Sequence, residues 1–116
     1  MSYLINSSHG PEDVERATVP FILANAAAGR GEARVFLTCD ALNLVVKTRD
    51  TGLTAPGYTP VATLVDEFVG KGGKIWVCKV CAAVMGIEAD DLVDGAEIGG
   101  APNTMDFLAA GGRVLV

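Results

Sequence analysis

Short apolar segments alternate with amphipathic segments along almost the whole chain, and this alternation constrains the fold more than any other feature. The pattern predicts strands at residues 3–6, 33–38, 74–78, 96–98 and 113–116, with helices or helical turns at residues 11–28, 41–47, 59–69, 80–85, 88–93 and 102–110. Such alternation is typical of helices that cross over between parallel strands. We therefore expect an α/β fold, a three-layer α/β/α sandwich with a mostly parallel sheet.

The size and apolar character of the chain fit this expectation. A chain of 116 residues is long enough for one hydrophobic core and too short for two, so we expect a single domain over residues 1–116. Half of the residues are hydrophobic and a fifth are charged. Strands buried on both faces and surface buried in a homo-oligomer would each explain this composition, and we expect both.

Charge and hydropathy exclude several classes of partner. The net charge is −5 and no cluster of Lys and Arg is present, which argues against binding to nucleic acid or to anionic membranes. The longest apolar stretch, residues 17–28, is about half of what a bilayer requires and contains Pro20 and Asn25. We find no signal-type segment at the start and expect a cytoplasmic protein. Its three cysteines, an odd number, argue against a disulfide scaffold.

A C-x-x-C motif, Cys78 and Cys81, stands where the predicted strand 74–78 runs into a helix. Thiolates are stabilised at helix N-termini by unpaired backbone N–H groups and by the positive end of the helix dipole. Lys79 adds a cation between the two thiols. We predict that Cys78 is reactive, whereas a structural and a functional role are equally open for Cys81.

Parallel topology would gather further candidates at one edge. His9 follows the first predicted strand, Cys39 the second, and Cys78 the strand at 74–78, and the carboxyl ends of parallel strands meet at the same edge of a sheet. For Cys39 the sequence favours a structural role, and for His9 a solvated one. Trp76, in the middle of a strand, is expected in the core or in a subunit interface.

Glycine-rich segments do not form a nucleotide site. Neither G-x-G-x-x-G after the first strand nor G-x-x-x-x-G-K-[ST] occurs, and the glycines at 70–73 precede a strand, which is the wrong position for phosphate on a helix N-terminus. We therefore expect no bound cofactor.

Three stretches resemble the DsrE/TusD-like family of small sulfur-relay proteins. The likeness runs over nearly the whole chain and lies in the strand-end cysteine with the alanines and glycine that follow it, in the loop after the first strand, and before the last helix: Cys78, Ala82, Ala83, Gly86, Ile87, residues 6–13 and residues 100–102. The resemblance implies a DsrE-like fold with a five-stranded, mainly parallel sheet that assembles into homo-oligomers, trimers or hexamers. It also implies that Cys78 carries a persulfide and exchanges sulfur with donor and acceptor proteins.

One departure from the family concerns Cys81. The family's sulfur carriers have a small residue at this position. A thiol three residues from a persulfide can attack its inner sulfur, which releases sulfide and leaves a Cys78–Cys81 disulfide. The second thiol therefore suits reductive sulfur release or dithiol redox chemistry better than sulfur storage.

Three functions follow. The first is sulfur transfer, with Cys78 as the sulfur acceptor and Cys81 as a resolving thiol. The second is a dithiol oxidoreductase that uses both cysteines, although thioredoxin-like proteins present a proline opposite the dithiol and Pro102 is the only later candidate. The third is binding without catalysis, either as a zinc module in which His9 and the cysteines supply ligands or as an oligomeric scaffold with inert thiols.

Overall fold

The sheet at the centre of the molecule has five strands, all parallel, in the order β4-β3-β2-β1-β5. The computed structural model describes residues 1–49 and 52–115. The strands are β1 (Ser2–Ser7), β2 (Glu32–Leu37), β3 (Lys74–Cys78), β4 (Ala96–Gly99) and β5 (Arg113–Leu115). The helices are α1 (Val14–Ala28), α2 (Val61–Gly70), α3 (Lys79–Met85) and α4 (Ala101–Ala109), with the 3-10 turns η1 (Cys39–Val45) and η2 (Ala89–Asp91).

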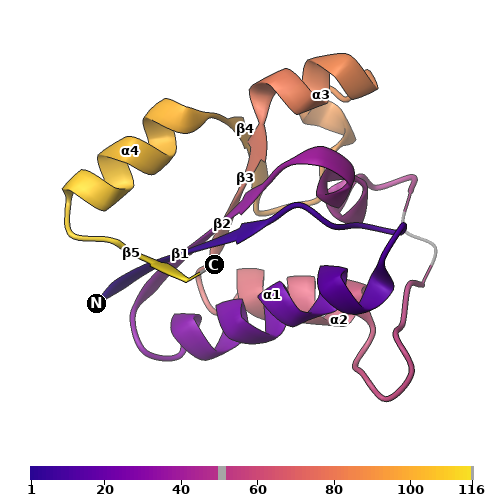
Figure 1. Ribbon diagram of the computed structural model, residues 1–116, viewed down its shortest axis with the longest axis horizontal. Coiled ribbons are helices and arrows are strands. Elements are labelled where there is room, and N and C mark those ends of the chain that lie inside the picture. Colours follow the sequence, from indigo (N-terminus) through magenta and orange to yellow (C-terminus); the bar gives the residue numbers. More distant parts are fainter. Residues whose placement is uncertain (50–51, 116) are drawn as a thin grey trace.

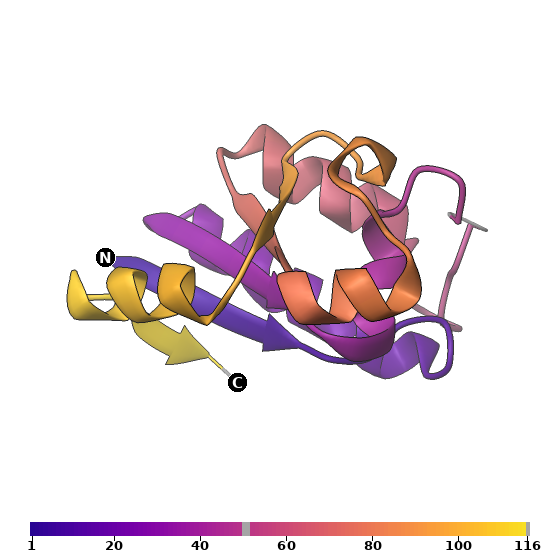
Figure 2. The ribbon, with the colours of Figure 1, turned by 90° about the horizontal axis from the view of Figure 1, so that it is seen from above.

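The helices form two layers, one on each face of the sheet. Figure 1 shows α1 and α2 side by side below the sheet and α3 and α4 above it. Seen from above, α3 lies toward the carboxyl ends of the strands and α4 toward the opposite end (Figure 2). The expected α/β/α sandwich is confirmed, and its sheet is entirely rather than mostly parallel.

Most predicted elements are present with small shifts at their ends. The helical segment expected at 41–47 is a 3-10 helix with shifted bounds, Cys39–Val45. The last strand covers Arg113–Leu115, while Val116 of the predicted strand lies outside the described residues. Part of the predicted loop 48–59, residues 50–51, also lies outside them.

The main core lies between the sheet and the layer of α1 and α2. Along β2 the side chains alternate, so that Ala33, Val35 and Leu37 are buried toward these helices. The rings of Phe21 on α1 and Phe68 on α2 meet edge to face with their centroids 6.4 Å apart. The apolar residues that were predicted at helical spacing in α2 therefore lie on its buried face.

A smaller cluster fixes α4 on the opposite face of the sheet. Trp76 is 8 % exposed and packs edge to face against Phe107 of α4, with 5.8 Å between ring centroids. Its indole N–H donates a hydrogen bond to Glu97 of β4 (3.1 Å), and the Arg34 guanidinium lies 5.9 Å from its ring centroid. Trp76 is thus a core residue of the single chain, as one of the two sequence interpretations proposed.

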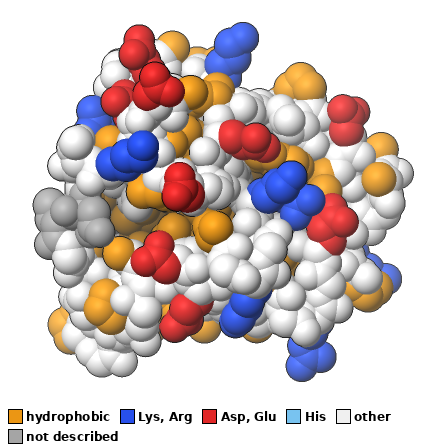
Figure 3. Space-filling view, turned by 180° about the vertical axis from the view of Figure 1, so that it is seen from behind, with side chains coloured by type: hydrophobic (Ala, Val, Ile, Leu, Met, Phe, Trp, Pro, Cys, Tyr) orange, Lys and Arg blue, Asp and Glu red, His pale blue; other side chains and the backbone are white. Residues whose placement is uncertain are grey.

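Surface charge is dispersed on the face seen from behind. In Figure 3 the Lys and Arg side chains stand apart among Asp and Glu, with apolar side chains between them. Among the described residues, every helix is too short or too polar to cross a membrane.

Candidate functional site

The three cysteines lie at the carboxyl-terminal edge of the sheet. Cys39 begins η1 directly after β2, Cys78 is the last residue of β3, and Cys81 lies in the first turn of α3. Because β2 and β3 are parallel neighbours, with Leu37 in register with Val77, the residues that follow the two strands lie at the same edge of the sheet. This confirms the predicted gathering of the cysteines at one edge.

Cys78 has hydrogen-bond donors directed at its sulfur. Partial burial of the thiol raises its pKa, but hydrogen bonds from the backbone N–H of Cys81, from the thiol of Cys81 and from the backbone N–H of Val80 lower it by more in total. The net result is a pKa below the ordinary value for cysteine. Lys79 was expected to contribute, but its exposed ammonium is not among the groups that shift the Cys78 pKa.

Cys81 has the opposite character. The backbone N–H of Cys39 donates to the Cys81 sulfur at 3.4 Å and lowers its pKa. Burial, the hydrogen bond that Cys81 gives to Cys78, and the negative charges of the Cys78 and Cys39 thiolates raise it, so that the net pKa is above the ordinary value. The C-x-x-C motif therefore holds two unlike thiols, since Cys78 ionises first and Cys81 remains a proton donor beside it.

Cys39 does not take the structural role that the sequence favoured. Its side chain is exposed, so it contributes nothing to the core. It has φ = 52°, in the left-handed region, and is the only non-glycine residue with positive φ among those described. Strained backbone of this kind occurs at functional sites where the surroundings hold it in place.

The surroundings of Cys39 come from the loop after β1. A Cβ atom on Gly10 would lie 2.1 Å from the carbonyl oxygen of Asp40, so only glycine allows the two loops to approach this closely. The Asp40 carboxylate accepts hydrogen bonds from the backbone N–H of Glu12 (3.2 Å) and from the Asn43 side chain (2.8 Å). The Asp40 carboxylate therefore joins the loop after β1 to the loop after β2.

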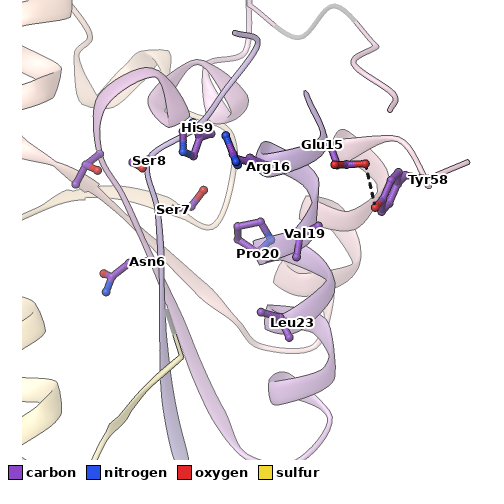
Figure 4. A pocket seen from close by; sticks show the side chains of 11 residues that line it. Asn6, Ser7, Ser8, His9, Glu15, Arg16, Val19, Pro20, Leu23 and Tyr58 are labelled. Carbon is purple, nitrogen blue, oxygen red and sulfur yellow. Dashed lines mark hydrogen bonds between the residues drawn. The ribbon is translucent and has the colours of Figure 1, made fainter. Parts of the chain in front are cut away.

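A cleft of 590 Å³ lies next to this loop, between the end of β1 and α1. It extends from Leu23 on α1 to Thr38, the residue before Cys39. Figure 4 shows the Ser7 side chain pointing from β1 toward α1, and its buried hydroxyl has no hydrogen-bond partner among the described residues. The hydroxyl of Tyr58 donates to Glu15 at 3.4 Å at one end of the cleft. The alternation of β1 places Ser7 on the buried face, but no sequence pattern indicated the cleft.

His9 lines the cleft and does not join the cysteines. Its Nδ1 lies 3.1 Å from a carboxylate oxygen of Glu12, and this contact, after a backbone hydrogen bond from Gly10, lowers the Glu12 pKa. Within residues 1–49 and 52–115, no three His, Cys, Asp or Glu residues are grouped so that they could hold a metal ion. The convergence of His9 with the cysteines that a zinc module requires is therefore not found there.

Comparison with known proteins relates this chain to one family and to a curated relative. The model of the DsrE/DsrF-like family matches residues 1–116. The uncharacterized protein MJ0760 of Methanocaldococcus jannaschii is 31% identical over 108 residues, which cover 92% of this chain and 39% of that protein. The chain thus spans about two fifths of the length of this curated relative.

Two solved structures are similar in fold. YchN of E. coli superposes with a TM-score of 0.80 at 22% identity, over 99% of this chain and 98% of that one. The protein MTH1491 of Methanobacterium thermoautotrophicum has a TM-score of 0.66 at 15% identity, over 98% and 96% of the two chains. Both likenesses concern the fold.

Proposed function

The chain belongs to the DsrE/DsrF-like family, and from this premise we propose that it is a small sulfur-relay protein whose sulfur acceptor is Cys78. The observation that carries the proposal is the environment of the Cys78 sulfur, where two backbone N–H groups and the Cys81 thiol favour the thiolate. The thiolate is the form of cysteine that attacks sulfur.

The proposed transfer is a thiol exchange at sulfane sulfur. The Cys78 thiolate attacks the outer sulfur of a donor persulfide, R–S–SH, and forms a new S–S bond. The S–S bond of the donor breaks, and the donor leaves as the thiolate R–S⁻. The product is a Cys78 persulfide, from which the thiolate of an acceptor protein takes the outer sulfur in the same way. No net oxidation occurs in either step.

Cys81 gives this site a second outcome. Its thiol is a neighbour of the Cys78 sulfur, where it affects the Cys78 pKa, so we expect it to attack the inner sulfur of the persulfide. That attack expels hydrosulfide and leaves a Cys78–Cys81 disulfide, in which two thiols have been oxidised and the sulfane sulfur reduced. The same proximity supports a dithiol oxidoreductase as the second candidate function. Failure to accelerate insulin reduction by dithiothreitol would remove that candidate.

We also propose that the protein assembles into a homo-oligomer, either a trimer or a hexamer. Large apolar side chains are exposed on α3, where Val80 is 70% and Val84 82% exposed, and also on α4 and β5. Exposed apolar surface of this kind is buried between subunits in many assemblies. Light scattering of the purified protein gives the number of subunits, and Val84→Lys should shift the protein toward monomer. We place the protein in the cytoplasm, where thiols stay reduced.

Mass spectrometry tests the sulfur transfer directly. The reduced protein is incubated with glutathione persulfide and its intact mass is measured under non-reducing conditions. We expect an increase of about 32 Da, one sulfur atom, in the Cys81→Ser variant, in which the persulfide cannot be resolved. The matched variant Cys78→Ser should show no such increase. An equal adduct in both variants would refute the role of Cys78.

A further inference from the structure

A third cysteine lies beside the C-x-x-C motif, directly after the neighbouring strand β2. The backbone N–H of Cys39 points at the Cys81 sulfur at 3.4 Å, although 42 residues separate the two cysteines along the chain. The Cys39 side chain is exposed, and its backbone is held in the left-handed region by the loop around Asp40. Core packing does not explain a cysteine at this position, because the side chain is exposed. The backbone conformation does not explain it either, because glycine would adopt a positive φ more easily.

We propose that Cys39 is a second resolving thiol. It converts the Cys78–Cys81 disulfide into a Cys39–Cys81 disulfide by thiol–disulfide exchange, and this returns Cys78 to its free form. The inference rests on the proposed function, because sulfide release is what forms the Cys78–Cys81 disulfide. It adds a third residue to the site and a closing step to its cycle.

The Cys39 backbone lies beside the Cys81 sulfur. The Cys39 Cα atom is one bond, about 1.5 Å, from the nitrogen that contacts this sulfur. A Cys39–Cys81 disulfide forms when the two Cα atoms are about 4.4–6.8 Å apart and their Cβ atoms face each other.

The exchange balances without a further reagent. The Cys39 thiolate attacks the Cys81 sulfur of the Cys78–Cys81 disulfide, the Cys39–Cys81 bond forms, and Cys78 leaves as a thiolate. One disulfide is lost and one is gained, so no oxidant or reductant is consumed. A thiol of low pKa is the better leaving group, and the donors around Cys78 make it that thiol. The exchange therefore runs toward free Cys78.

The exposed Cys39 side chain makes Cys39 the point at which an external reductant acts in the last step. Cys78 and Cys81 are half-buried, whereas Cys39 is exposed. Two reducing thiols, or one dithiol, from solution would reduce the Cys39–Cys81 disulfide by attack on its Cys39 sulfur, and their oxidation to a disulfide would restore both cysteines.

Disulfide mapping after sulfur loading tests the proposal. The reduced protein receives one equivalent of glutathione persulfide, free thiols are blocked with iodoacetamide, and the chain is digested with trypsin. Cleavage after Lys79 places Cys78 and Cys81 in different peptides, and Cys39 falls in a third, so each pairing gives its own mass. We expect Cys39 joined to Cys81 and Cys78 alkylated.

Variants separate this inference from the proposed function. In Cys39→Ser the Cys78–Cys81 disulfide should persist, while the control Thr38→Ser, in the same loop, should behave as the wild type. In Cys78→Ser, oxidation with diamide, which supplies no sulfur, should form the Cys39–Cys81 disulfide within single chains on a non-reducing gel.

Two failures are distinguishable. If Cys78→Ser does not form the Cys39–Cys81 disulfide, or if the wild type retains Cys78–Cys81 with Cys39 alkylated, the inference is overturned while sulfur transfer stands. If Cys81→Ser gains no sulfur on Cys78, the proposed function fails, although diamide still reports whether Cys39 and Cys81 pair.

Discussion

Replacement of Gly10 by Ala tests whether the loop after β1 holds Cys39 in place. A Cβ atom there would lie 2.1 Å from the carbonyl oxygen of Asp40 and 2.7 Å from its carbonyl carbon. Ordinary van der Waals contact begins at 3.4 Å, so the backbone of Asp40 must move by about 1 Å or more. The displaced residue is bonded directly to Cys39.

Two quantities should change together. Overpacking of this kind costs about 1–3 kcal/mol, so we expect the free energy of unfolding in urea to fall by that amount. The Cys39 N–H lies 3.4 Å from the Cys81 sulfur, and a shift of this size would break the contact. The diamide-induced Cys39–Cys81 disulfide should then form more slowly, while alkylation of Cys78 should keep its rate.

A matched glycine provides the control. Gly70 is the last residue of α2, and a Cβ atom on it would meet no atom within 4 Å. Gly70→Ala should be neutral or stabilise the protein by up to about 1 kcal/mol, because alanine is the better helix former. The reasoning is refuted if Gly10→Ala unfolds at the same urea concentration as the wild type, or if it loses stability while Cys39 and Cys81 pair at an unchanged rate.

Three further predictions concern the thiols and the two helical layers. Because the Cys78 pKa is lowered and the Cys81 pKa raised, alkylation of Cys78 by iodoacetamide should reach half its maximal rate at a lower pH than alkylation of Cys81; the reverse order would contradict the assignment. Asn25→Ala removes two hydrogen bonds of 2.9 Å that join α1 to its own turn and to α2, and should lower the free energy of unfolding by about 1–3 kcal/mol, whereas an unchanged urea midpoint would show that this link is unimportant. Phe107→Ala removes the partly buried ring that covers Trp76, the single tryptophan, so the Trp76 fluorescence should shift to longer wavelength. The free energy of unfolding should fall by about 1–3 kcal/mol, and an unchanged spectrum would show that α4 does not shield Trp76.

Local sequence patterns predicted the secondary structure because each pattern is satisfied within a few residues. The strand at Lys74–Cys78 has the predicted bounds, since an apolar run follows glycines and leads into a helical segment. Where tertiary contacts compete, the predicted bounds were wrong. The helical segment expected to begin at residue 41 begins at Cys39 as a 3-10 helix, and the Asp40 carboxylate accepts hydrogen bonds from Glu12 and Asn43.

The sequence by itself determined the α/β alternation, the family resemblance and the position of Cys78 at the junction of a strand and a helix, because all of these depend on neighbours along the chain. Only the tertiary structure decided how the other two cysteines lie relative to each other. The parallel pairing of β2 with β3 brings the Cys39 backbone to the Cys81 sulfur, and the approach of Gly10 to Asp40 fixes the loop that presents it. Cys39 acts on the Cys81 pKa across the two strands, whereas the donors that lower the Cys78 pKa, Cys81 and Val80, are neighbours along the chain.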